Sequence, residues 1–411
     1  MKLSIIICVY NTPIAYLDEC LQSITQSTLE PESYEICLVD DGSTVDYSTL
    51  WERYAVKYQK TENQGIFRAR LLGISMAEGD YIAFVDSDDT VSVHYHRPML
   101  TFAEMGQHDV VFNGWAFHSE RSRYYCKNDT TIARDFTYCG EDILPAFLAN
   151  RGREHSYYVL WNKLFSARVL RAAREQLLPI AEREGKYNFS EDALICFFAF
   201  LHAKRIRNLH TGYYFYRIHS QQTVNVISRE RLASHIKYMA MTFSIMEQHL
   251  PNNAKKAECL RSLRKWKQLM ARTHYSHAKG GGYTDLYPMI SQCYGVPRLR
   301  PSRYRDGSVY ASNWLLPKNY TEIDRALLAL WHSTEPHTVS LRGCTKDTQL
   351  LLFRLMADGA PILPHDRNGL RLPRPVIRWR DRLVMHPLVY RMGLLLFPKG
   401  SRLRAILKKR I

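Results

Sequence analysis

Three apolar segments near the start of the chain each run into a polar cluster, and this repeated pattern restricts the possible folds most strongly. The segments Leu3–Val9, Tyr34–Val39 and Tyr81–Val85 have the composition of strands that are buried on both faces. Helices are expected between these strands, at residues 14–24, 45–58 and 67–77. Strands that alternate with helices at this spacing predict a parallel α/β sheet, whose ligands bind beyond the carboxyl ends of the strands.

The third of these strands ends in three carboxylates within four positions, Asp86, Asp88 and Asp89. Like charges at this spacing raise one another's pKa unless a positive charge lies between them. A divalent cation is one such partner, because Mg²⁺ and Mn²⁺ bind one or two protein carboxylates together with substrate phosphates. Asp and Ser also bend chains and cap helices without any metal. The segment therefore predicts either a Mn²⁺ or Mg²⁺ site or a plain turn.

The composition is that of a folded protein with more than one domain. The chain has 411 residues, of which 46% are hydrophobic and 23% charged, so two or three domains are expected. We expect neither a secretory signal nor a membrane-spanning helix. The nine cysteines lack C-x-x-C spacing and are odd in number. They are expected to be reduced thiols, which favours a cytoplasmic location.

The positive charge is concentrated at the end of the sequence. Between Arg367 and Ile411 thirteen Lys and Arg face a single acid, Asp381, which accounts for +12 of the net charge of +16. These cations alternate with apolar residues such as those of Leu394–Phe397. The pattern predicts a tail that lies reversibly on an anionic membrane surface. A solvated basic helix packed on the protein is the alternative, and no motif supports a nucleic-acid partner.

The chain is expected to have three parts, residues 1–225, 226–365 and 366–411. The first part continues with mixed elements, including two antiparallel strands at Val110–Phe117 and Arg121–Cys126. The middle part is an accessory region of helical character, with periodic segments over residues 232–250, 254–277, 323–332 and 345–356. No motif there indicates a role, and nothing in the sequence indicates the oligomeric state.

Short motifs occur in order along the first part of the chain. They are Cys8-Val9-Tyr10-Asn11, Asp40-Asp41-Gly42-Ser43, Asn63-Gln64-Gly65 with Ala69-Arg70, Asp86-Ser87-Asp88-Asp89, Trp161-Asn162-Lys163-Leu164, Glu191-Asp192 and Tyr216-Arg217-x-His219. With this series, residues 2–223 resemble a family 2 glycosyltransferase of the bacterial surface-polysaccharide or teichoic-acid type. The resemblance implies a GT-A fold, which is a Rossmann-like α/β nucleotide-sugar domain. The sequence departs from the family at Cys8, where Pro is usual, and at Leu71, where Asn is usual.

The resemblance also implies roles for individual residues. Asp86 and Asp88, with His219, are implied to hold a divalent cation (Mn²⁺ or Mg²⁺). Asp192 is implied as the general base, which agrees with the expectation that a carboxylate at a helix N-terminus stays ionised. Glu191 would orient or bind the acceptor, although Ser190-Glu191-Asp192 is also an ordinary helix start. Contacts with the donor are implied for Val9, Tyr10, Asn11, Asp40, Asp41, Asn63, Gly65, Arg70, Asp86, Ser87 and Arg217.

The expected function is an inverting, metal-dependent transfer of a sugar from a nucleotide-diphospho-sugar, such as a UDP-sugar, to a hydroxyl group. The acceptor would be a cell-surface glycan or a lipid-linked glycan at the cytoplasmic face of the cell membrane. Two other classes stay open. A nucleotidyltransferase would need a Gly-rich, basic phosphate loop where Tyr10-Asn11-Thr12-Pro13 stands. A degenerate domain could instead serve as a basic scaffold for acidic polymers.

Overall fold

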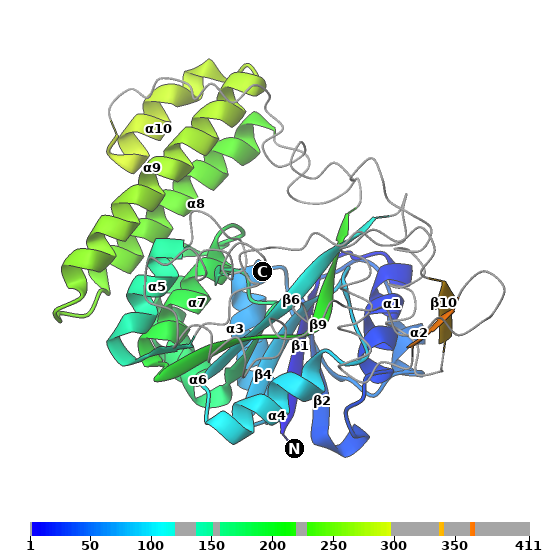
Figure 1. Ribbon diagram of the computed structural model, residues 1–411. Helices are drawn as coiled ribbons and strands as arrows, with labels where there is room; N and C mark the ends of the chain where they lie inside the picture. Colours follow the sequence, from blue (N-terminus) through cyan, green and yellow to red (C-terminus); the bar gives the residue numbers. More distant parts are fainter. Residues whose placement is uncertain are drawn as a thin grey trace. The chain divides into compact units, whose positions relative to one another are not determined.

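The computed structural model describes residues 2–119, 137–150, 157–218, 228–296, 337–340 and 362–365 (Figure 1). The chain forms two compact units, residues 1–334 and 335–411. Several predictions lie outside the described residues: the metal-ligand role of His219, the strand at 121–126, the helices at 323–332 and 345–356, and the basic tail. In the second unit, β10 (His337–Ser340) pairs in parallel with β11 (Ile362–His365).

The first unit is built on a mixed nine-stranded sheet with the order β3-β2-β1-β4-β8-β6-β9-β5, in which β7 also pairs with β9. The strands are β1 Leu3–Val9, β2 Tyr34–Asp40, β3 Lys57–Lys60, β4 Tyr81–Asp86, β5 Thr90–Val91, β6 Val110–Ser119, β7 Thr137–Cys139, β8 Lys163–Ser166 and β9 Arg205–Ile218. Strands β1, β2 and β4 are parallel, as predicted, β3 is a fourth parallel strand that was not predicted, and β8 joins β4 antiparallel. Strand β6 is antiparallel to β8 and parallel to β9. It confirms the strand predicted at 110–117, whose expected antiparallel partner at 121–126 lies outside the described residues.

Alternate residues of the central strand β1 serve two separate hydrophobic cores. Leu3, Ile5, Ile7 and Val9 belong to the core that contains helix α1, whereas Ile6 belongs to the core that contains α3, α6 and α7. Successive side chains of a strand point to opposite faces, so a strand between two layers is mostly apolar. The buried polar exception in β1 is Ser4, whose hydroxyl donates to Glu35 at 2.6 Å. The need for apolar residues on both faces is why the apolar runs correctly predict buried parallel strands.

Helices cover both faces of this sheet (Figure 1). They are α1 Ile14–Thr25, α2 Ser48–Trp51, α3 Ile66–Met76, α4 His96–Gly106, α5 Ile143–Asn150, α6 Ala167–Glu184 and α7 Glu191–His202. The expected long helix at 45–58 is wrong. Only one turn forms there, and the chain then enters β3, an exposed edge strand whose Lys57–Lys60 pairs with Cys37–Asp40. Pairing with β2 decides this structure, since β3 has no apolar face of its own.

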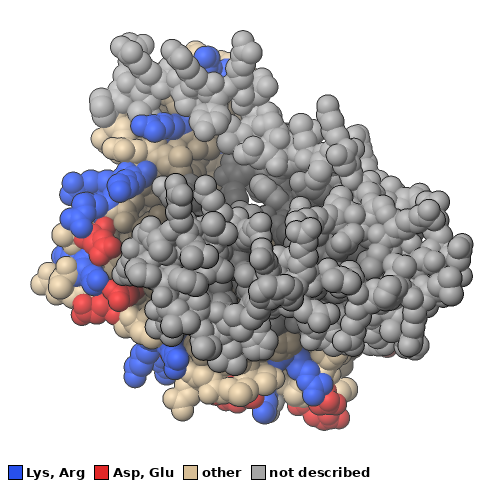
Figure 2. All heavy atoms as spheres, viewed as in Figure 1, with Lys and Arg blue, Asp and Glu red and all other residues tan. Residues whose placement is uncertain are grey.

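The helical region after the sheet contains α8 Arg229–Gln248, α9 Lys256–Gly280 and α10 Tyr287–Tyr294, which pack on one another. Helix α8 also contacts α7, and α9 contacts α5. Helix α9 carries seven Lys and Arg against one acid, Glu258, so a local basic excess exists outside the tail as well. Lys and Arg side chains are visible over this region in Figure 2.

Two global features can be stated for the described part of the chain. Its seven cysteines are all free thiols, in agreement with the sequence. None of its helices is both long enough and apolar enough to cross a bilayer.

Candidate active site

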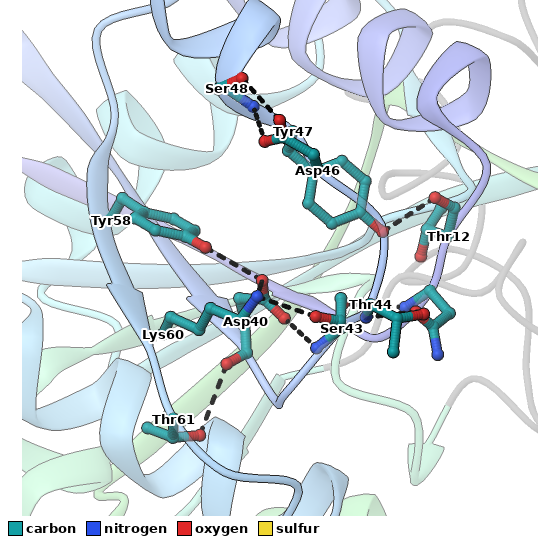
Figure 3. A network of polar contacts seen from close by, with 11 residues as sticks. Thr12, Asp40, Ser43, Thr44, Asp46, Tyr47, Ser48, Tyr58, Lys60 and Thr61 are labelled. Atoms are coloured by element: carbon teal, nitrogen blue, oxygen red, sulfur yellow. Dashed lines mark hydrogen bonds and ion pairs between the residues drawn. The ribbon is translucent and has the colours of Figure 1, made fainter.

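The polar loops that follow β1 and β2 are joined to each other around Asp40. The Asp40 side chain is fully buried at the end of β2, where its two carboxylate oxygens accept hydrogen bonds from the Ser43 amide at 2.7 Å and the Tyr58 hydroxyl at 2.9 Å (Figure 3). Lys60 lies 3.7 Å from the same carboxylate. Asn11, after β1, accepts hydrogen bonds from Thr44 and donates its amide to the Ser43 hydroxyl. These hydrogen bonds hold the loop after β1 against the loop after β2.

The neighbouring carboxylate, Asp41, holds the loop before α3. Its two oxygens accept the amides of Gln64 at 2.7 Å and Gly65 at 2.8 Å. Burial raises the pKa of Asp41, against the lowering effect of these two amides. Gly65 has φ +92°, a conformation that favours glycine, and a Cβ there would collide with the side-chain oxygen of Asn188. A cavity of about 340 Å³ opens beside Asp41 between α3 and α6, but Asp86, Asp88 and Asp192 do not line it.

Arg70 joins the acidic end of β4 to the start of α7. Its guanidinium donates to Glu191 at 2.5 Å and to Asp86 at 3.2 Å. Burial alone would lower the pKa of Arg70, but the carboxylates of Glu191 and Asp86 outweigh it and hold that pKa above its ordinary value. The pKa of Glu191 is raised to about 7, mainly by burial and further by Asp192, although Arg70 lowers it. The buried guanidinium of Arg70 therefore links the two predicted acidic motifs.

The residue pair at the start of α7 presents one buried and one more accessible acid. Glu191 is buried, whereas Asp192 is only partly buried and accepts the amide of Ala193 at 2.7 Å. The Asp192 charge contributes to the raised pKa of Asp86, so the two carboxylates lie within electrostatic reach of each other. The expected helix cap is absent here: Ser190 has φ +64° and makes no capping hydrogen bond. This start of a helix is therefore not an ordinary one.

Asp89, the third carboxylate of the predicted cation site or turn, anchors the loop after β4. Its oxygens accept the Tyr214 hydroxyl at 2.6 Å and the Arg217 amide at 2.7 Å, which ties the loop after β4 to β9. Arg217 donates to the Asp88 backbone carbonyl and to Glu19, and its guanidinium lies 4.3 Å from the Tyr16 ring centre. These contacts stabilise the acidic loop, and a role of Arg217 in donor binding stays a prediction.

Three more of the predicted donor residues lie at the same edge of the sheet, at or just after the ends of β1 and β4. Ser87 shares a hydrogen bond of 2.7 Å with Thr12, a residue that the sequence analysis missed. Val9 is buried, and its backbone carbonyl accepts the Asp41 amide at 2.9 Å. Tyr10 is 54% exposed and is available to a ligand. In the sequence, this position is marked by an aromatic residue that follows an apolar strand directly and precedes Asn11.

The residues present fit a divalent cation that is held by two protein carboxylates and, for the rest, by substrate phosphates. Burial raises the pKa of Asp86, opposed by Arg70, and the nearby charge of Asp88 raises it further, which is a repulsion that a cation would relieve. Among the described residues no group of three or more His, Cys, Asp and Glu side chains could hold a metal ion. Mn²⁺ and Mg²⁺ bound by two carboxylates and substrate phosphates need no such group. Asp86 and Asp88 are the candidate protein ligands.

The sheet order, the helices on both faces and the acidic strand ends define a GT-A-like α/β domain. Residues 4–168, about two fifths of the chain, match the family described as Glycosyl transferase family 2. This match confirms the resemblance of the first part of the chain to family 2 glycosyltransferases that the sequence motifs indicated.

Relatives cover parts of the chain. EpsH of Bacillus subtilis, named as a predicted glycosyltransferase, is 31% identical over 229 residues, which are 54% of this chain and 62% of EpsH. A poly(ribitol-phosphate) β-glucosyltransferase of Bacillus spizizenii is 38% identical over 117 residues, 27% of this chain and 18% of that protein. The crystal structure of S. aureus TarS aligns with a TM-score of 0.48 and 17% identity, over 71% of this chain and 50% of TarS. The chain thus spans less than two thirds of EpsH.

Proposed function

We propose that the protein is an inverting, metal-dependent glycosyltransferase that moves a sugar from a nucleotide-diphospho-sugar to a hydroxyl group. The family assignment supports the class of reaction. The single observation that carries the proposal is that Arg70 forms ion pairs with both Asp86, at 3.2 Å, and Glu191, at 2.5 Å. It brings the acidic loop after β4 next to the carboxylate pair at the start of α7, which is the arrangement that donor activation and acceptor deprotonation require together.

Each part of the site has a task in this reaction. The loops held by Asp40 and Asp41 would bind the nucleoside, with Tyr10 free to contact the base or ribose. Asp192 would take the proton from the acceptor hydroxyl as its oxygen attacks the anomeric carbon and the bond to the nucleoside diphosphate breaks. A cation held by Asp86 and Asp88 would supply neutralisation of the diphosphate charge. Glu191 would hold Arg70 in place or orient the acceptor.

The acceptor is proposed to be a cell-surface glycan or a lipid-linked glycan. Sequence similarity to a poly(ribitol-phosphate) β-glucosyltransferase, and to the minor teichoic acid biosynthesis protein GgaB at 34% identity over 113 residues, supports an acceptor of the polyol-phosphate kind. We propose further that the tail at residues 367–411 holds the enzyme at the inner face of the cell membrane. Its charge and apolar residues are the support for this.

The proposed function is tested by incubating the full chain with UDP-glucose, UDP-N-acetylglucosamine and UDP-galactose in the presence of Mn²⁺. Release of UDP with water as the acceptor measures donor cleavage, and a poly(ribitol phosphate) acceptor measures transfer. We expect cleavage of one donor, its loss on chelation, and its loss in Asp88→Ala. Asp192→Asn should bind donor normally and transfer about 100-fold or more slowly.

Four outcomes would contradict parts of this proposal. Full activity of Asp192→Asn would refute the assignment of the base, and full activity after chelation would refute the metal. Wild-type protein that cleaves none of the donors, and is as inert as Asp88→Ala, would favour a basic scaffold. Release of pyrophosphate from a nucleoside triphosphate in place of UDP would indicate a nucleotidyltransferase.

A further inference from the structure

Helix α8 holds the segment that leads into α7. This segment, residues 186–190, precedes Glu191 directly. The Tyr238 hydroxyl donates to the Lys186 carbonyl at 2.8 Å, and the Phe189 ring stacks on His235 with 3.8 Å between ring centres. Both partners, Tyr238 and His235, lie on α8. A helix that follows the sheet in sequence therefore holds the segment that leads into α7.

The central contact is made by the hydroxyl of Thr242 on α8. Thr242 is fully buried, and its oxygen lies 2.5 Å from the Tyr187 hydroxyl, 2.6 Å from the Ser190 hydroxyl and 3.0 Å from the Tyr238 carbonyl. A hydroxyl has one hydrogen to donate and two lone pairs to accept. Thr242 can therefore donate to Tyr238 and accept from both Tyr187 and Ser190, which uses its whole hydrogen-bonding capacity.

Ser190 adopts a backbone conformation that needs such support. Its φ of +64° and ψ of +12° lie in the left-handed region, which a residue with a side chain rarely occupies. A serine in this position normally caps its helix, yet here its hydroxyl is bonded to Thr242 across a separation of 52 residues. The dihedral angles of Ser190 set the direction in which α7 begins, so this bond controls where the two acids after it are placed.

The same segment also touches the loop held by Asp41. The side-chain oxygen of Asn188 accepts the Ile66 amide at 3.2 Å, at the first residue of α3. Gly65, whose amide is bound by Asp41, packs directly against this oxygen. Segment 186–190 is therefore held by α8 on one side and by the proposed donor loop on the other.

We propose that Thr242, on α8, is a positioning residue that sets the placement of Asp192 through Ser190. This inference rests on the proposed function, because it assumes that Asp192 is the base. It gives the helical region after the sheet a task that no motif in the sequence indicates. A displacement of about 1 Å in a catalytic group lowers a rate by up to about 100-fold, so a small shift of α7 suffices.

The test compares Thr242→Val, which keeps the shape but removes the hydroxyl, with Thr242→Ser, which keeps the hydroxyl. Donor cleavage by the full chain is measured with the UDP-sugar that the wild type uses and with Mn²⁺. We expect Thr242→Val to lower kcat about tenfold or more, with KM for the donor and the number of donor sites unchanged. Thr242→Ser should recover most of the rate. Ser190→Ala removes the same bond from the other side and should also lower kcat.

Phe243→Leu is the matched control on α8. Phe243 packs on Trp266 and Tyr294, in the contact with α9 and α10, so its truncation loosens the helical region without touching the hydroxyl chain. Its kcat should equal that of the wild type.

The inference is overturned if Thr242→Val and Ser190→Ala cleave donor at the wild-type rate, or if Thr242→Ser or Phe243→Leu loses as much activity as Thr242→Val. A wild-type protein that cleaves no donor refutes the proposed function instead, and this inference falls with it.

Discussion

Replacing Arg70 by methionine tests the buried link between the two acidic motifs most directly. The side chains of Arg70 and Glu191 are each 9% exposed, and that of Asp86 is 33% exposed. Removal of one partner from a buried ion pair costs about 3–5 kcal/mol, because the other charge is left without compensation. The more accessible Asp86 adds at most about 1 kcal/mol, since water screens it. We therefore expect Arg70→Met to lower the free energy of unfolding by about 3–5 kcal/mol.

This loss should depend on pH in a definite direction. Burial raises the pKa of Glu191 to about 7, and Arg70 opposes that rise, so removal of Arg70 moves the pKa higher still. A carboxyl with a raised pKa in the folded state contributes stability at low pH, and this contribution is lost as the pH rises through the folded-state pKa. Above about pH 7 the variant binds more protons when folded than the wild type does. Its deficit in stability should therefore grow from about pH 6 to about pH 8.5.

Equilibrium unfolding in urea, followed by tryptophan fluorescence at both pH values, measures these quantities. The double variant Arg70→Met with Glu191→Gln has no buried charge at position 191, and it should recover most of the loss. Arg68→Met is the control on the same helix, because Arg68 donates to the Ala181 carbonyl and Gln64, so its cost should be smaller and independent of pH. A deficit below about 1 kcal/mol, constant with pH and unchanged in the double variant, would refute the reasoning.

Three further predictions concern other parts of the chain. Lys163 is fully buried, and burial lowers its pKa to about 8, so the unfolded chain binds more protons than the folded chain between about pH 8 and 10.5. The free energy of unfolding should therefore rise over that range by about 3 kcal/mol more in the wild type than in Lys163→Met. Equal changes with pH in urea unfolding of the two proteins would contradict this. Gly65→Ala should lower stability by more than about 1 kcal/mol and weaken UDP binding in calorimetry, whereas Gly282→Ala, with φ +75° but open space around it, should leave UDP binding intact. Deletion of residues 367–411 should abolish flotation with anionic vesicles, and flotation of the shortened protein would rule out the tail as the anchor.

Much of the site could be predicted from the sequence because strand ends are encoded locally. The apolar runs of β1, β2 and β4 stop where Asn11, Asp40 and Asp86 begin, and parallel strands present their carboxyl ends at one edge. Arg217 shows what such reasoning leaves out. Its position in a motif predicts a role in donor binding, which stays a prediction, but does not reveal that its hydrogen bonds reach Glu19, 198 residues away, and the Asp88 carbonyl. Nothing in the neighbouring sequence specifies those partners.

The sequence by itself determined the buried parallel strands and the acidic loops after them, because hydrophobic periodicity and turn residues act over a few neighbouring positions. Only the tertiary structure decided that residues 57–60 form an edge strand, that Arg70 pairs with Glu191, 121 residues away, as well as with Asp86, and that Ser190 turns away from its own helix to reach Thr242. These outcomes depend on which distant groups are brought into contact when the apolar layers close. A buried polar group must then find a partner wherever the packing provides one.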